Sequence, residues 1–270
     1  MPSYEPVTAL LRGLDVLRAV NRLEGATVKD IHRATGLNQP AVVRMLETLI
    51  HAGLIVRRRD EAVYVPTGRT LELSAGYAAH REVGLAATPV MEALRRTVGW
   101  PSDVAVFDGD AMVVAHTSRA EGRLLFGRRP GYRAPIMATS LGRAFLAHCD
   151  PAERERALSL AARSPEPWNG PARDPTEAEV FLRAIRAAGY AVMDDCYSAR
   201  EYDGLANAIG VPVMLNGAAI AALNLMYLRE ITGEAEVVSR FLPILQQAAG
   251  DLSAALARSR GDVPSSAAFP

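Results

Sequence analysis

The chain has 270 residues, of which 49% are hydrophobic, and its 30 lysines and arginines balance its 30 aspartates and glutamates. This length suits two domains of ordinary size. The zero net charge excludes nucleic-acid binding over the whole surface, so affinity for DNA must come from locally placed basic groups. No apolar run approaches the roughly 18–20 residues that cross a bilayer. The first residues lack a signal-peptide pattern, and Cys149 and Cys196 have no metal or redox spacing. We therefore expect a cytoplasmic protein with reduced thiols.

The chain begins with a helical pattern over residues 7–23. The apolar side chains of this pattern recur at spacings of three and four: Leu10, Leu11, Leu14, Leu17 and Val20. Gly25 follows, so the helix is expected to end before it.

Two shorter helices follow, separated by a Gly36-Leu37 turn. Thr27 is expected to cap the first of them, with Asp30 in the capping-box position. Asn38 is expected to cap the second, and Pro40 lies in its first turn, where the missing N–H costs nothing. Two short helices joined by a tight turn are typical of a helix-turn-helix.

A basic hairpin is predicted directly after this pair, with strands over residues 54–58 and 62–66. The arrangement predicts a winged helix-turn-helix, whose second short helix presents its N-terminal residues to the major groove of duplex DNA. Gln39 and Arg44 can bond base edges or phosphates, and the arginines of the hairpin can reach the backbone. The predicted DNA contacts are Thr27, Asn38, Gln39, Pro40, Val43, Arg44, Arg57, Arg58 and Arg59. Winged helices also occur as protein–protein modules, so that alternative stays open.

Residues 68–98 have the pattern of two helices broken near Gly84, the first of which is expected to be a linker. We expect, in order, a DNA-binding domain, a linker helix, an effector domain and a disordered tail: residues 1–68, 69–83, 84–260 and 261–270.

The second domain mixes strands and helices, which predicts an α+β fold with helices packed on a central antiparallel sheet. Strands are expected over residues 103–107, 111–116, 123–126, 190–193, 208–215 and 218–227. Helices are expected over residues 139–148, 151–162, 175–188 and 234–257. The Asn216-Gly217 pair between the last two strands is a strong hairpin signal.

A small-molecule pocket needs an apolar lining with a few convergent polar groups. The helix that begins near Thr139 and Ser140 presents free N–H groups, which favour an anion such as a carboxylate. Asn207 and Asn224 interrupt apolar strands, and a buried amide needs a partner, for which a ligand is one candidate. Further residues of the predicted effector site are Met137, Ala138, Tyr197, Leu205 and Met226.

Each of these features also has a purely structural explanation. Thr139 and Ser140 are ordinary helix caps, Asn224 can bond the neighbouring backbone, and methionines often fill a core. A further basic stretch can attract an acidic effector or build a subunit interface, but most such stretches form a solvated face; its members are Arg123, Arg128, Arg129 and Arg133.

Patterns typical of enzymes and metal sites are missing from the sequence. The five histidines show no zinc-binding spacing, and there is no phosphate-binding glycine loop and no nucleophile elbow. Asp194 and Asp195 are adjacent, so their side chains would diverge on a strand. We therefore expect no catalytic site, no metal and no cofactor.

Several segments together resemble the IclR family of bacterial transcription regulators. RGLDVLRAV resembles the opening helix of that family, and LNQPAVVRMLETLIHAGLIVR resembles its recognition helix and wing. RAPIMATSLGRAFLA is similar to a loop and helix of the effector domain, and GYAVMDD with DGLANAIGVPVMLNGAAIAALNL is similar to the C-terminal signature. Within the family, VGWPSDVAVFDGDAMVV and LNLMYL look most like the MhpR-type activators of hydroxyphenylpropionate catabolism.

The resemblance implies a winged-helix domain, a linker helix and a GAF-like effector domain. It implies dimers or dimers of dimers on palindromic operators, with small carboxylates or aromatic acids as effectors. It also implies that Asp194 is an acid of the effector pocket. The chain departs from the family at Met137, where histidine is usual, and at Asn207, where cysteine is usual, and both departures bear on ligand identity more than on fold.

The sequence therefore predicts a ligand-responsive, homo-oligomeric transcription regulator that binds duplex DNA and controls catabolism of an aromatic or other small carboxylic acid. Two alternatives stay open. The second domain of a winged-helix protein can bind a protein partner instead of a metabolite, and Cys149 or Cys196 can act as a redox sensor.

Overall fold

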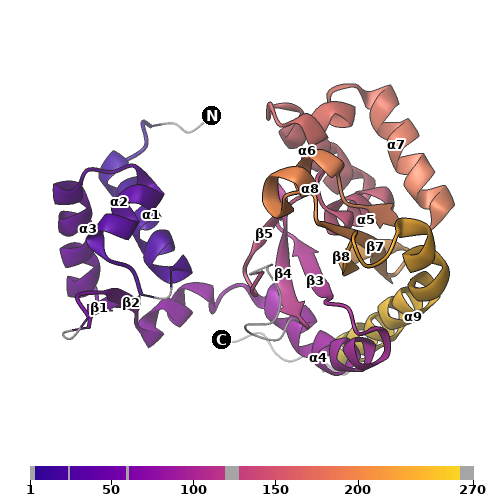
Figure 1. Cartoon of the computed structure of the whole chain (residues 1–270), viewed down its shortest axis with the longest axis horizontal. Coiled ribbons are helices and arrows are strands. Elements are labelled where there is room, and N and C mark those ends of the chain that lie inside the picture. Colours follow the sequence, from indigo (N-terminus) through magenta and orange to yellow (C-terminus); the bar gives the residue numbers. More distant parts are fainter. Residues whose placement is uncertain (1–3, 24, 59–60, 119–127, 262–270) are drawn as a thin grey trace, which may run out of the picture. The chain divides into compact units, whose positions relative to one another are not determined.

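The computed structural model describes residues 4–23, 25–58, 61–118 and 128–261 (Figure 1). The chain divides into two compact units, Met1–Tyr77 and Ala78–Pro270. The predicted strand over residues 123–126, the predicted contact Arg59 and the tail after residue 261 lie outside the described residues.

The first unit packs three helices against a two-stranded antiparallel hairpin. Its elements are α1 (Thr8–Arg22), α2 (Val28–Thr35), α3 (Gln39–His51), β1 (Ile55–Arg57) and β2 (Tyr64–Pro66). The helices and the hairpin share one apolar core, which contains Val16, Val20, Ile31, Val42, Leu46 and Ile55. The predicted winged helix-turn-helix is confirmed.

Helix α1 buries only the later part of its apolar stripe. Val16, Ala19 and Val20 are fully buried, whereas Leu10 is 62% exposed and Leu11 is 50% exposed. Spacing alone showed that these residues share one side of a helix, but not that the unit leaves the beginning of that side uncovered.

The residues around the unit boundary differ from the predicted linker helix. Gly68–Ser74 form a short 3-10 helix, and α4 (Ala78–Val98) then runs unbroken through Gly84. The predicted break at Gly84 is wrong. A glycine is suited to this position because a Cβ atom there would lie 3.0 Å from the carbonyl oxygen of Ala115, on a neighbouring strand.

The second unit is built on a six-stranded antiparallel sheet with the order β5-β4-β3-β8-β7-β6. Its strands are β3 (Asp103–Phe107), β4 (Ala111–Thr117), β5 (Arg133–Pro135), β6 (Ala191–Val192), β7 (Ala206–Leu215) and β8 (Ala218–Leu228). The predicted hairpin at Asn216-Gly217 is confirmed, with both residues at positive φ. Strand β5 occupies a place where no strand was predicted.

Helices cover both faces of this sheet. They are α4, α5 (Ser140–His148), α6 (Pro151–Ala162), α7 (Pro175–Ala188), α8 (Asp195–Tyr202) and α9 (Glu234–Gly261). Figure 1 shows α4 and α9 along one face, here called the outer face, and α5 along the other, here called the inner face. Helix α8 was not predicted.

Residue alternation assigns the side chains of β7 and β8 to these faces. Ala206 and Ala208 of β7 belong to the same buried cluster as Phe145 of α5, so they point to the inner face. Met226 pairs with Ala208 across the strands and belongs to that cluster too. The inner face is therefore an apolar surface under α5, where a ligand site was predicted.

Candidate functional site

The recognition helix α3 begins as the sequence predicted. The side-chain oxygen of Asn38 accepts a hydrogen bond from Ala41 N at 2.9 Å, and Pro40 lies in the first turn. Val42 and Leu46 are fully buried and anchor the helix in the core. These contacts hold the N-terminal end of α3 on a rigid base, as reading the major groove requires.

The solvent side of α3 carries the polar residues expected to meet DNA. Gln39 and Arg44 are exposed, and Val43 is half-buried beside them. No ion pair holds the Arg44 guanidinium among the described residues, so this side chain is available to a base edge or a phosphate. Thr27 differs, because its hydroxyl forms a capping box with Asp30 and is occupied by that role.

The wing places exposed arginines beside the recognition helix. Arg57 ends β1, and Arg58 follows it with its backbone N–H bonded to Val63 O at 2.8 Å. The Arg58 side chain lies 3.7 Å from the carboxylate of Glu61, an exposed pair of the kind that contributes little to stability. Both arginines therefore remain able to contact a phosphate backbone.

The predicted effector residues fall into two groups, and the larger group lies on the inner face at the start of α5. Thr139 caps the helix, with its hydroxyl accepting from Gly142 N at 3.2 Å. Ser140 is buried, and its hydroxyl has no hydrogen-bond partner among the described residues. The buried apolar members of this group are Met137, Ala138, Tyr197 and Met226.

Asn224 belongs to the same group. Its side chain is 1% exposed, and its Oδ1 accepts a hydrogen bond from Asp103 N at 2.7 Å. Its Nδ2 has no partner among the residues that the structure describes. The bond to the neighbouring backbone thus satisfies the amide oxygen of Asn224 and leaves the amide nitrogen unsatisfied. An unsatisfied donor is unusual for a buried side chain.

Asn207 and Asp194 form the second group, at the edge of the sheet. Asn207 pairs with Tyr227 across β7 and β8 and points to the face opposite Ala206 and Ala208. The structure therefore does not bring Asn207 and Asn224 together. Leu205 joins neither group and is 38% exposed.

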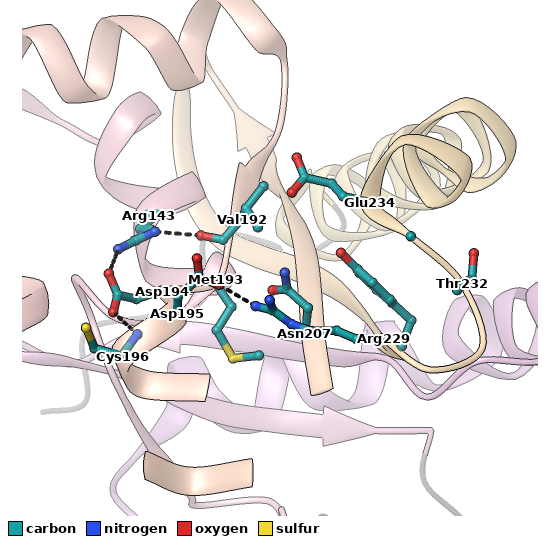
Figure 2. Close-up of a pocket in the computed structure, with 12 residues that line it drawn as sticks. Arg143, Val192, Met193, Asp194, Asp195, Cys196, Asn207, Arg229, Thr232 and Glu234 are labelled. Carbon is teal, nitrogen blue, oxygen red and sulfur yellow. Dashed lines mark hydrogen bonds and ion pairs between the residues drawn. The ribbon is translucent and has the colours of Figure 1, made fainter. Parts of the chain in front are cut away.

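A cavity of about 550 Å³ lies beside β6, and we call it the edge pocket (Figure 2). Its lining consists of Arg143, Val192, Met193, Asp194, Asp195, Cys196, Asn207, Tyr227, Arg229, Thr232, Gly233 and Glu234. Figure 2 shows Arg143 and Asp194 on one side of the cavity and Thr232 and Glu234 on the other. The pocket thus gathers residues from α5, β6, β7, β8 and the start of α9.

Most charged side chains of the edge pocket pair with one another or bond to the backbone. Arg143 donates to Asp194 at 2.6 Å and to two backbone carbonyls, and burial lowers the pKa of Arg143. Asp194 also caps α8 by accepting from the N–H groups of two following residues. Arg229 pairs with Asp195, which leaves Glu234 as an additional carboxylate. The lining thus has three carboxylates and two guanidiniums, and this net negative charge disfavours the binding of an anionic ligand.

Two hydroxyl groups of the edge pocket are buried without partners among the described residues, those of Tyr227 and Thr232. Burial, and next the charge of Glu234, raises the pKa of Tyr227 to about 12, so this phenol stays neutral at physiological pH. The lining is therefore better suited to a neutral or cationic group than to a carboxylate.

Sequence reasoning missed a buried arginine in the second unit. Arg128 is 5% exposed, although its basic stretch was interpreted as a solvated face. Its guanidinium lies among Asp103 and three tyrosines, Tyr132, Tyr197 and Tyr202. These partners lie in segments far apart along the chain, which periodicity does not connect.

Other site classes find little support in the described residues. No group of three or more His, Cys, Asp or Glu side chains there is placed to share a metal ion. Among the helices of the described ranges, none combines the length and apolar composition that a membrane span requires.

Two family profiles match the chain. The IclR helix-turn-helix domain matches residues 9–59, and the C-terminal domain of the bacterial transcriptional regulator IclR matches residues 75–254, more than half of the chain. The chain belongs to the IclR family. It is therefore a DNA-binding transcriptional regulator, and the resemblance inferred from its motifs is confirmed.

IclR relatives with assigned roles align along most of this chain. It is 28% identical to the Pca regulon regulatory protein of Pseudomonas putida, over 91% of this chain and 83% of that one. It is 26% identical to the p-hydroxybenzoate hydroxylase transcriptional activator of Acinetobacter baylyi, over 91% of this chain and 90% of that one. These relatives are regulators, as the sequence predicted.

A solved IclR homologue from Microbacterium hydrocarbonoxydans, in complex with 4-hydroxybenzoate, has a similar fold. The TM-score is 0.66 at 25% identity, over 93% of this chain and 99% of that one. The α+β architecture with an N-terminal helix-turn-helix and a C-terminal antiparallel sheet is thus shared with an aromatic-acid complex.

Proposed function

We propose that this IclR-family regulator controls genes for the catabolism of an aromatic acid and that a small aromatic carboxylate is its effector. The observation that carries the proposal is the homologue with bound 4-hydroxybenzoate, which aligns over 93% of this chain. Two relatives with names from the Pca and p-hydroxybenzoate systems support the same effector class.

In this proposal the effector lies on the inner face of the sheet, not in the edge pocket. The start of α5 places the positive end of a helix dipole at Ser140, which favours an anion. The N–H groups of Thr139 and Gly142 are already bonded to Pro135 O and to the Thr139 hydroxyl. Asn224 adds an amide donor without a partner among the described residues. The second unit, Ala78–Pro270, then contains the effector domain, and the first unit, Met1–Tyr77, contains the DNA-binding domain.

For DNA binding, we propose that Gln39 and Arg44 contact base edges while Arg57, Arg58 and Arg59 contact the backbone. Self-association would place two recognition helices on a palindromic operator. The exposed apolar part of α1 supports self-association, because an uncovered apolar stripe is typical of an interaction surface.

Thermal unfolding of the full chain with separate ligands tests the effector class. The panel is 4-hydroxybenzoate, benzoate and hydroxyphenylpropionate, with acetate as the acid that lacks a ring. An aromatic acid at about 100 times its dissociation constant should add about 2.7 kcal/mol of stability, and acetate should add nothing at the same concentration. If no aromatic acid stabilises the protein, the proposal is overturned in favour of a protein partner for the second unit.

An electrophoretic mobility shift on the DNA upstream of the gene tests the proposed DNA contacts of the first unit. Arg44→Ala should weaken sequence-specific binding about tenfold or more. Arg18→Ala is the matched control, because Arg18 is an exposed arginine on α1 that pairs with Asp15. Undiminished specific binding by Arg44→Ala would remove Arg44 from the contact set while leaving the family membership intact.

A further inference from the structure

Arg128 is a permanently charged side chain inside the second unit, with 5% of its surface exposed. Burying a guanidinium is unfavourable unless close acceptors replace the lost water. A buried arginine is therefore expected to have several short hydrogen bonds.

The contacts of Arg128 fall short of that expectation. Its Nη1 lies 3.7 Å from Asp103 Oδ2, beyond hydrogen-bond distance, and its Nη2 donates to Tyr197 OH at 3.4 Å. Its Nε has no partner among the described residues. The rings of Tyr132 and Tyr202 lie 5.0 and 5.7 Å from the guanidinium carbon, so aromatic faces supply much of its environment.

The unsatisfied donors around Arg128 belong to one connected region. Asn224 accepts from the backbone of Asp103, the residue that faces Arg128, and leaves its own Nδ2 unpaired. Gly210, which pairs with Asn224 across the sheet, lies against Ser140, whose hydroxyl is also unpaired. A guanidinium edge, an amide and a hydroxyl thus lie along the inner face with capacity for an acceptor that the described protein does not provide.

We propose that Arg128 is the carboxylate-binding residue of the effector site and that its surrounding tyrosines form the wall against which the aromatic ring of the effector packs. This inference rests on the proposed function and names the residue that gives it acid specificity. The carboxylate meets the free Nε edge of the guanidinium, whose planar fork matches two carboxylate oxygens. Tyr132, Tyr197 and Tyr202 surround the guanidinium, so the ring of a carboxylate bound there would contact aromatic side chains.

Calorimetric titration of the full chain with an acid and its primary amide tests the proposal. The pair is 4-hydroxybenzoate and 4-hydroxybenzamide, which differ in charge and hardly in shape. The wild-type protein should bind the acid at least about tenfold more tightly than the amide, because only the acid carries the charge that Arg128 complements. Equal affinity for both would overturn the proposal without any variant.

Arg128→Gln should then reduce affinity for the acid about 30-fold or more and leave affinity for the amide nearly unchanged, so that the preference disappears. Arg129→Gln is the matched control, because Arg129 is the adjacent arginine and is exposed. It should retain the wild-type preference. Arg128→Lys keeps the positive charge without the planar guanidinium and should bind the acid with intermediate affinity. This variant replaces Arg128→Gln if Arg128→Gln does not fold.

The outcomes separate this proposal from the broader function. If the wild type binds the acid and Arg128→Gln binds it equally well, Arg128 is only a structural partner of Asp103, and the aromatic-acid regulator stands. If the wild type binds no aromatic acid of the panel, the proposed effector class fails and the role of Arg128 fails with it.

Discussion

Ser140 and Gly210 approach so closely that a Cβ atom added at Gly210 would lie 2.5 Å from the Ser140 carbonyl oxygen. The start of α5 therefore rests directly on β7. Gly210→Ala should push the helix away and reduce the free energy of unfolding by about 1–3 kcal/mol, which denaturant unfolding would measure. Gly250→Ala on α9 is the control, because an added Cβ meets nothing within 4 Å there, and its stability should stay equal or rise. Equal stability of the two variants would contradict the close approach.

Thr27 and Asp30 form a reciprocal capping box at the start of α2. The hydrogen bond from the Thr27 side chain, and next that from its backbone, lowers the pKa of the Asp30 carboxyl. Because this pKa is lower in the folded state, the cap stabilises the unit above the ordinary carboxyl pKa, and the contribution is lost as pH falls through the lowered value. Thr27→Ala should cost about 1 kcal/mol and raise the pKa of Asp30 toward its ordinary value.

An NMR titration of the Asp30 carboxyl, in wild type and in Thr27→Ala, checks that prediction. Thr97→Ala on α4 is the control, because the Thr97 hydroxyl bonds only its own helix among the described residues. An unchanged Asp30 pKa in Thr27→Ala would show that the backbone, not the hydroxyl, dominates the cap.

The two cysteines should differ strongly in reactivity. Cys149 is 3% exposed, and burial raises the pKa of its thiol to about 11, whereas Cys196 is exposed. The thiolate is the reactive form. Iodoacetamide at neutral pH should therefore modify Cys196 in the native protein and Cys149 only after unfolding, as mass spectrometry would show. Modification of Cys149 before Cys196 would contradict the buried position.

Self-association should depend on the exposed start of α1. The double variant Leu10→Gln and Leu11→Gln removes apolar surface that the first unit does not bury. It should weaken oligomer formation in sedimentation experiments with little change in thermal stability. Leu85→Gln, which changes a 70% exposed leucine of α4, should leave the oligomeric state unchanged. An unchanged oligomer in the double variant would exclude α1 from the interface.

Local signals predicted the parts of the fold that local chemistry determines. Asn38 and Thr27 cap their helices because a side-chain oxygen meets backbone N–H groups two or three residues away. The Asn216-Gly217 turn forms because both residues accept positive φ. These interactions span a few residues, so a single sequence contains all the information they need.

Features that depend on distant partners were missed. Arg128 is buried because Asp103 and Tyr197, 25 and 69 positions away, meet it in space. Gly84 lies inside an unbroken helix at a point where the backbone of Ala115 leaves little room for a side chain, whereas its pattern indicated a break. Asp194, which the resemblance implies to be a pocket acid, lines the edge pocket and also caps the unpredicted helix α8.

Asn207 lies between Ala206 and Ala208 on β7, and its side chain points to the opposite face of the sheet from theirs. Neighbouring positions of β7 have different surroundings, since Ala206 and Ala208 belong to the buried cluster of the inner face and Asn207 lines the edge pocket. If the effector lies on the inner face, as proposed, substitutions of Ala206 or Ala208 should affect its binding, and substitutions of Asn207 should change the edge pocket instead. Single substitutions in β7 thus act on one face at a time, whereas an insertion or deletion of one residue would move every following side chain of the strand to the opposite face.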